Sequence, residues 1–264
     1  MARWTRPGAT PLEDMRIPLS TRTDIERIEA CVSRAREMGL RIMTFVVPDT
    51  APTPWLPAVV AAVRRARAAD APEIRIALEG RIVSDEGHIS VAALPPGVDA
   101  LYITLDTLPM GMVCVSALEL REAFEEGRTS AMSIVRRAVE VLQAAMRRNP
   151  GIVLSRPFAL LSAVGIPEEW VSAEAMLTLA REASRTGASL QIDEWERSPR
   201  AGTADAFVNA GVPVLFGSGA RTADDVGVYE YIGSLVRRVP GLAEDLLGRQ
   251  RGAAFDPSIT AFSP

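Results

Sequence analysis

Short apolar runs alternate with longer amphipathic stretches along most of the chain. Seven of these runs are rich in β-branched and aromatic residues and are bounded by turn residues, at 16–20, 41–47, 74–78, 100–105, 151–155, 189–192 and 212–216. Unbroken apolar runs of this length are typical of parallel strands buried on both faces. The pattern therefore predicts strands that alternate with helices, as in an α/β fold.

The stretches between the strands carry apolar residues at helical spacing. In residues 24–38 they recur every three or four positions, Thr23 and Glu26 have the spacing of a capping box, and Gly39 supplies a left-handed stop. Further helices are expected after a second capping box at Ser116 and around residues 132–146. Each predicted helix is thus defined by its start and stop signals as well as by its apolar stripe.

Three helices end in a glycine that lies directly before a strand, at Gly39, Gly187 and Gly211. Short connections of this kind, joined by right-handed crossovers, are typical of wound α/β folds. We therefore predict a distorted seven-stranded (β/α)7 TIM-like barrel, with its chemistry at the C-terminal ends of the strands. We expect residues 1–264 to form one domain with a core of about 14–236 and loosely held tails at 1–12 and 250–264. Two smaller domains are the weaker alternative.

Composition excludes several kinds of chemistry. The chain of 264 residues has a net charge of −4 and a pI of about 5.3, so no basic field suggests a nucleic-acid partner. It contains no lysine, which excludes Schiff-base and P-loop lysine chemistry. His88 is the only histidine, which excludes a zinc site built from several imidazoles. We expect His88 to be exposed on a small hairpin around Asp85–Gly87.

The cysteines and the lengths of the apolar segments indicate the cellular compartment in which the protein is expected. Cys31 and Cys114 are too few and too scattered for a disulfide framework, and each is expected to be a small core residue. No stretch of 18 apolar residues and no signal peptide is recognised, so neither a membrane span nor secretion is expected. These features favour a cytoplasmic protein.

Polar residues stand where the predicted strands end. Arg16 and Pro18 end the first strand, Glu79 follows the third, Asp106 the fourth, and Arg156 the fifth. Gln191 and Asp193 mark the sixth, and the seventh is followed by the stretch GSGARTADDVG at 217–227.

These motifs, with DMRIPLST at 14–21 and FVVPDT at 45–50, resemble those of the PHP family, the polymerase and histidinol phosphatase domain. The resemblance covers roughly residues 14 to 236, and its most specific part is residues 217–227. It implies a distorted seven-stranded barrel that holds up to three metal ions for phosphoester hydrolysis. Of the family's ligand positions, only Glu79 keeps its residue type.

Asp106 stands where the family has a His, and six further positions hold residues that cannot bind a divalent metal: Arg16, Pro18, Pro48, Arg156, Gly219 and Arg221. We therefore expect no metal and no cofactor, and infer that the family's hydrolysis has been lost. A weak carboxylate site for Mg²⁺, made by Glu79, Asp106 and Asp193, is a minor alternative.

Three arginines replace expected imidazoles, and the barrel would bring Arg16, Arg156 and Arg221 together with the carboxylates Glu79 and Asp106. One interpretation is an ion-pair network that closes the barrel and binds nothing. The other is an anion site for phosphate or carboxylate, formed by these arginines with Ser218, which precedes a predicted helix start.

We therefore predict a catalytically degenerate barrel that acts as a ligand-binding, regulatory or scaffold protein. Its partner would be an anionic small molecule or another protein, with Asp193, Trp195 and Glu196 as rim contacts. The alternative is an enzyme, either a phosphoesterase or a metal-independent lyase or isomerase, in which Glu79 or Asp106 is the general acid or base.

Overall fold

The computed structural model describes residues 12–49, 54–67, 71–111 and 113–250. Most of the two expected tails, 1–12 and 250–264, lies outside these ranges. All seven predicted strands are present: β1 (Glu13–Pro18), β2 (Ile42–Pro48), β3 (Glu73–Arg81), β4 (Ala100–Thr104), β7 (Val153–Leu154), β8 (Ser189–Asp193) and β9 (Val214–Gly217). They form one parallel sheet in the order β1-β2-β3-β4-β7-β8-β9.

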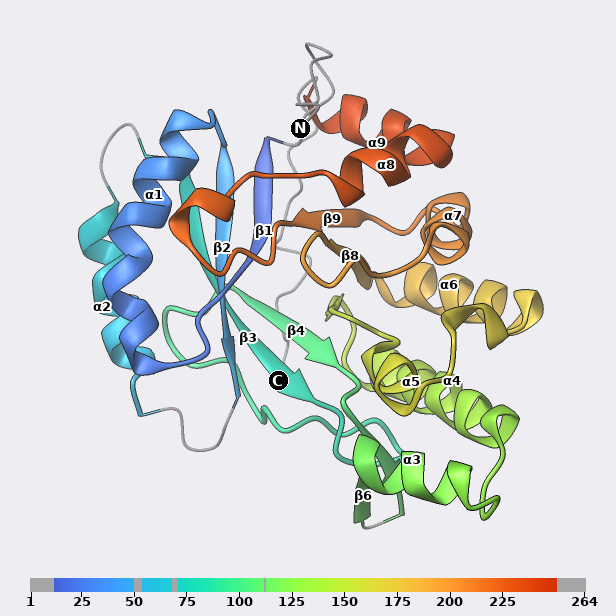
Figure 1. Cartoon of the computed structure of the whole chain (residues 1–264). Coiled ribbons are helices and arrows are strands. Elements are labelled where there is room, and N and C mark those ends of the chain that lie inside the picture. Colours follow the sequence, from blue (N-terminus) through green and yellow to red (C-terminus); the bar gives the residue numbers. More distant parts are fainter. Residues whose placement is uncertain (1–11, 50–53, 68–70, 112, 251–264) are drawn as a thin grey trace.

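Helices cover the outside of this sheet, which curls into a nearly closed barrel (Figure 1). On one side of the view lie α1 and α2, and on the other lie α4, α6 and α7. The helices are η1 (Arg22–Arg27), α1 (Ile28–Glu37), α2 (Leu56–Ala66), α3 (Ala117–Glu125), α4 (Ala131–Arg148), α5 (Ala159–Val164), η2 (Glu168–Trp170), α6 (Ala173–Thr186), α7 (Ala201–Asn209), η3 (Ala223–Asp225), α8 (Tyr231–Arg238) and α9 (Pro240–Gln250). The predicted TIM-like (β/α)7 architecture is confirmed.

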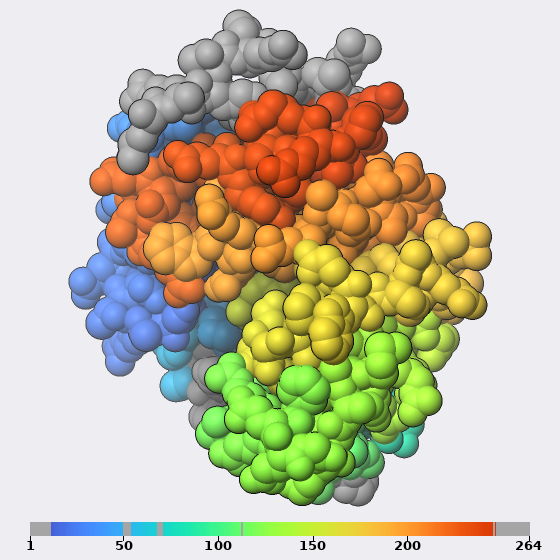
Figure 2. Space-filling view, turned by 45° about the vertical axis from the view of Figure 1, so that its right-hand side comes forward, coloured from blue at the N-terminus to red at the C-terminus, as the bar shows by residue number. Residues whose placement is uncertain are grey.

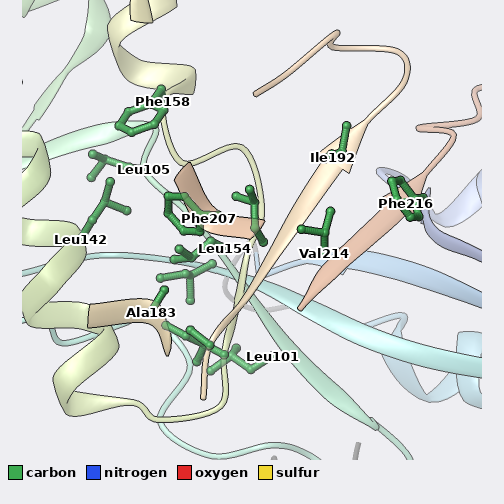
Figure 3. Packing of buried hydrophobic residues seen from close by; sticks show 14 of the residues in the cluster. Leu101, Leu105, Leu142, Leu154, Phe158, Ala183, Ile192, Phe207, Val214 and Phe216 are labelled. Atoms are coloured by element: carbon green, nitrogen blue, oxygen red, sulfur yellow. The ribbon is translucent and has the colours of Figure 1, made fainter. Parts of the chain in front are cut away.

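Two separate apolar cores follow from the alternation of side chains along each strand. The outer core lies between the strands and the helices, where Leu154 and Val214 pack among Leu142 of α4 and Phe207 of α7 (Figure 3). The inner core is small and belongs to the barrel interior: Met15, Val46, Ala77, Tyr102, Val153 and Leu215. The strands bury polar residues on both sides of this apolar plug: Glu13, Arg75 and Ser189 toward the N-terminal ends, and Glu79 and Asp193 toward the C-terminal ends.

The barrel closes between β9 and β1 without a strand ladder. The backbone N–H of Gly219 donates to the carbonyl oxygen of Arg16 at 3.0 Å. The buried carboxylate of Asp14 accepts from the backbone N–H of Ser218 at 2.9 Å and from that of Gly227 at 3.1 Å. Segments more than 200 residues apart therefore meet at this seam. On the surface, too, blue parts from near the N-terminus lie against orange parts from near the C-terminus (Figure 2).

Three local predictions need correction. The first helix begins with the 3-10 segment η1, capped by Thr21 and Asp24 rather than by Thr23 and Glu26, because Asp24 accepts from the backbone N–H groups of Ser20 and Thr21. Cys114 is exposed and not in the core, since it lies on the hairpin of β5 (Thr107–Met110) and β6 (Val113–Ser116), which the apolar pattern did not predict. Helix α9 extends beyond the expected core.

Candidate functional site

The C-terminal ends of the strands hold a buried ion-pair network centred on Arg16. Its Nη1 donates to Asp193 Oδ2 at 2.9 Å, and its Nη2 donates to Glu79 Oε1 at 3.2 Å. The three side chains are between 1% and 7% exposed. Arg16 comes from β1, Glu79 from β3 and Asp193 from β8, so only closure of the barrel brings them together.

Two uncharged residues complete this layer. Ser155 follows β7, and its Oγ lies 2.8 Å from Glu79 Oε1 and 2.7 Å from Gln191 Oε1. The hydroxyl has one proton, and the carboxylate is the stronger of its two acceptors. Ser155 therefore adds a further charge-assisted contact to Glu79.

Arg156 approaches the same carboxylate from the next position in the chain. Its Nη2 donates to Glu79 Oε2 at 3.0 Å, and its side chain is 24% exposed. Its backbone φ is 53°, in the left-handed region that a residue with a Cβ rarely adopts. Within the described residues its Nε is buried and has no hydrogen-bond partner. A strained backbone thus holds a partly satisfied guanidinium beside the network, at a cost of about 1–3 kcal/mol.

The charges around Glu79 determine its protonation. Burial alone would raise its pKa, but the positive charges of Arg16 and Arg156 and the hydrogen bond from Ser155 outweigh burial, so its pKa is lowered. Glu79 is therefore an anion at neutral pH. The pKa of Arg16 is raised, since the two carboxylates outweigh the burial that would lower it.

Asp106 lies at the edge of this group. It follows β4, is exposed, and its pKa is raised through desolvation, with a further contribution from the charge of Glu79; Arg81 and Arg156 act in the opposite direction. Of the two predicted acid–base candidates, Asp106 is thus the one whose environment favours the protonated form.

The third arginine, Arg221, is on the rim and not in the network. Its guanidinium lies 5.6 Å from the centroid of the Trp195 ring and 3.7 Å from Glu196 Oε1. Arg221 is 47% exposed and Glu196 38%. The structure therefore brings Arg16 and Arg156 together on Glu79, whereas Arg221 pairs with residues of the loop after β8.

Glycines and a serine of the last motif make room for this arrangement. A Cβ on Gly217 would lie 2.5 Å from Arg16 Cβ, and one on Gly219, where φ is +63°, would lie 2.7 Å from Asp193 Oδ1. Between them Ser218 donates its backbone N–H to Asp14, and its Oγ accepts from the N–H of Ala220 at 3.1 Å. The stretch after β9 thus packs directly against the network.

The residues present do not fit the metal ions that the PHP resemblance implies. Within residues 12–49, 54–67, 71–111 and 113–250, no group of three or more His, Cys, Asp or Glu side chains is placed to hold a metal ion. The two buried carboxylates, Glu79 and Asp193, already accept from Arg16. A cation there would have to displace a guanidinium that cannot lose its charge.

Some contributors were missed by the sequence reasoning, and one minor expectation is met. Asp14, Ser155 and Gln191 were not predicted as site residues. A signal existed for Ser155 and Gln191, since both stand at the polar ends of apolar runs. Asp14 precedes the apolar residues of its strand, and its signal was its place at the start of the stretch DMRIPLST. His88 is exposed as expected, with its Nδ1 2.8 Å from Ser84 Oγ on the turn that Gly87 ends.

No described helix combines the length and the apolar character needed to cross a membrane.

Comparisons with known proteins bear on shape alone. No family model matches the chain, and neither does any curated protein. N-isopropylammelide isopropylaminohydrolase from Burkholderia multivorans is similar, with 15% identity and a TM-score of 0.47 over 88% of this chain and 63% of that one. A mutant of organophosphorus hydrolase from Deinococcus radiodurans has 11% identity and a TM-score of 0.36, over 95% of this chain and 90% of that one. The chain thus spans less than two thirds of the isopropylaminohydrolase.

Proposed function

We propose that this chain is a PHP-like barrel without metal-dependent catalysis. It binds a small phosphate- or carboxylate-bearing ligand at the mouth of the barrel, the C-terminal strand ends that carry Arg16, Glu79 and Arg156. A regulatory or scaffold role would be exerted through that ligand. The observation that carries the proposal is Arg156, a guanidinium held by a left-handed backbone at the mouth with a buried and unpaired Nε.

Loss of catalysis is supported by the position of Arg16. Its two Nη atoms bind Glu79 and Asp193, the carboxylates of strands β3 and β8. In the PHP resemblance Arg16 stands at a metal-ligand position. The cationic charge between the acidic groups is therefore supplied by the protein itself, so the barrel is closed without a metal.

Anion binding is supported by the N–H donors of Arg156 that have no partner in the described part of the chain. One of its nitrogens is used by Glu79, while Nε lacks a partner among the described residues. Because the Arg156 side chain is 24% exposed, an oxyanion can accept from the donors that Glu79 leaves unused. A phosphate or carboxylate also matches the planar fork of a guanidinium.

The test is calorimetric titration of the purified chain with inorganic phosphate, sulfate and acetate at low ionic strength. We expect saturable binding of at least one anion, and a loss of about tenfold in affinity for Arg156→Gln, consistent with one charge-assisted contact. Arg121→Gln, which removes an exposed guanidinium on α3, is the matched control and should bind as the unaltered chain does. Absence of binding heat with all three anions would contradict the proposal.

A second candidate function follows from Asp106, whose raised pKa suits a general acid or base. In this alternative the chain is a metal-independent lyase or isomerase, or a residual phosphoesterase. Turnover of a generic phosphate ester, measured with and without added Mn²⁺ and abolished in Asp106→Asn, would favour the enzyme over the binding protein.

A further inference from the structure

The loop after β8 is held rigidly from several sides. The backbone N–H of Glu194 donates to the carbonyl oxygen of Gly217 at 2.9 Å, and the N–H of Glu196 donates to Asp193 Oδ1 at 2.8 Å. The carboxylate of Glu194 caps helix α8, accepting from the N–H groups of Tyr231 and Ile232 at 2.7 and 2.8 Å. The loop is therefore fixed to both the buried network and the last helices.

This fixed loop holds a large apolar side chain in solvent. Trp195 is 55% exposed, although Asp193, two residues earlier, is only 1% exposed. A Cβ added at Gly219 would lie 2.8 Å from Trp195 Cβ and 2.7 Å from Asp193 Oδ1. The Trp195 side chain therefore starts next to the buried network. A loop fixed in this way presents the indole from a preorganised backbone, because little loop entropy remains to be lost on binding.

Arg221 beside the indole is poorly satisfied. Its ion pair with Glu196 is long, at 3.7 Å, and both side chains are open to solvent. Exposed pairs of this kind contribute little, so an incoming anion can replace Glu196 as its partner. The rim therefore offers an indole with a guanidinium over one of its faces, 5.6 Å from the ring centroid, which leaves the other face for a ligand.

We propose that Trp195 and Arg221 form a subsite for a flat ring, and that the ligand of the mouth is an aromatic or heteroaromatic compound carrying phosphate or carboxylate. The ring stacks on the indole, and the anionic group lies between the guanidinium groups of the mouth. This inference rests on the proposed anion-binding function and names the class of ligand that the function would take.

The experiment compares two ligands of equal charge that differ in the ring. Phenyl phosphate and cyclohexyl phosphate are titrated calorimetrically into the unaltered chain, with inorganic phosphate as the reference. We expect phenyl phosphate to bind about fivefold more tightly than cyclohexyl phosphate, the preference that an aromatic pair typically gives beyond burial. Trp195→Leu should reduce that ratio to about one, because leucine buries apolar area without a π face.

Trp170→Leu is the matched control, since Trp170 is 49% exposed on η2 and lies near no described cation–π partner. It should keep the fivefold ratio. Equal affinities for the two esters in the unaltered chain, or a ratio unchanged by Trp195→Leu, would overturn the ring subsite and leave anion binding in place. If none of the three phosphates binds, the proposed function itself fails and the subsite with it.

Discussion

Asp14 at the seam and Glu79 at the mouth are both buried acids, but their hydrogen-bond partners and the directions of their pKa shifts differ. At the seam, Asp14 accepts from the backbone N–H groups of Ser218 and Gly227, which carry only partial charges. At the mouth, Glu79 accepts from two guanidinium groups and a hydroxyl. Burial raises the pKa of Asp14 to about 6 despite its hydrogen bonds, whereas the arginines lower the pKa of Glu79.

The comparison shows that full charges offset desolvation of a carboxylate and backbone dipoles do so only in part. The contributions of the two acids to the stability of the fold therefore depend on pH in opposite directions. Ionised Glu79 stabilises the fold above its unfolded pKa of about 4.5, and this contribution disappears as the pH falls through its lower folded pKa. Protonated Asp14 stabilises the fold below about pH 3.8, and this contribution is lost as the pH rises through about 6.

The largest expected effect is at the mouth. Arg16→Met removes the shared cation of Glu79 and Asp193, leaving two buried carboxylates without their main partner. We expect the free energy of unfolding to fall by about 3–5 kcal/mol, measured by urea denaturation at pH 7. If Glu79 and Asp193 are doubly replaced by Gln and Asn as well, part of that loss should be recovered.

Arg221→Met is the control, because this arginine belongs to the rim and is 47% exposed. It should cost less than about 1 kcal/mol. Similar losses for the two variants would show that the buried network does not differ energetically from a surface pair.

The next effect concerns the seam and depends on pH. Asp14→Asn removes the titrating group, so the stability of the unaltered chain relative to this variant should increase as the pH falls from 7 to 4. The expected change over this range is about 2.4 kcal/mol, most of the full effect of a pKa raised from 3.8 to about 6. Paired urea denaturation curves at several pH values give this difference directly. A difference that decreases toward low pH would mean that Asp14 is stabilised as the anion.

The smallest expected effect on stability comes from removing single buried hydroxyls, one with a hydrogen-bond partner and one without. Ser155→Ala removes the hydroxyl that contacts Glu79 and should cost about 1.5 kcal/mol. Thr104→Val removes a buried hydroxyl that has no partner in the described structure, so it should be neutral or stabilising. Thermal denaturation of both variants provides the test, and an equal loss in each would argue that Thr104 has a buried partner such as water.

Much of the fold was predictable because its signals are local. The seven strands were recognisable as apolar runs with turn residues at each end, and Gly39 marked a helix end through its positive φ. The hairpin β5–β6 escaped prediction, since Met110, Val113 and Cys114 are exposed and follow neither alternation nor a buried run. Helix α9 was not predicted, and it lies after residue 236, where the core was expected to end.

The candidate site was predictable in its positions and less so in its pairing. The strand ends identified Arg16, Glu79, Asp106 and Arg156 because the C-terminal ends of parallel strands meet on one face. The sequence treated Arg16 and Arg221 as equivalent, but one is buried between two acids and the other lies on Trp195. Which carboxylate accepts from which guanidinium depends on distances across the barrel, which no local pattern contains.

The sequence by itself determined the order of strands and helices, the absence of lysine and of imidazole clusters, and the placing of charge at one end of the strands. Only the tertiary structure decided how those charges are satisfied. Closure of the seam brings Asp14 to Ser218 and Arg16 to Asp193, residues separated by 204 and 177 positions. Desolvation and Coulomb attraction act through space, so a buried ion pair exists only once the barrel has closed.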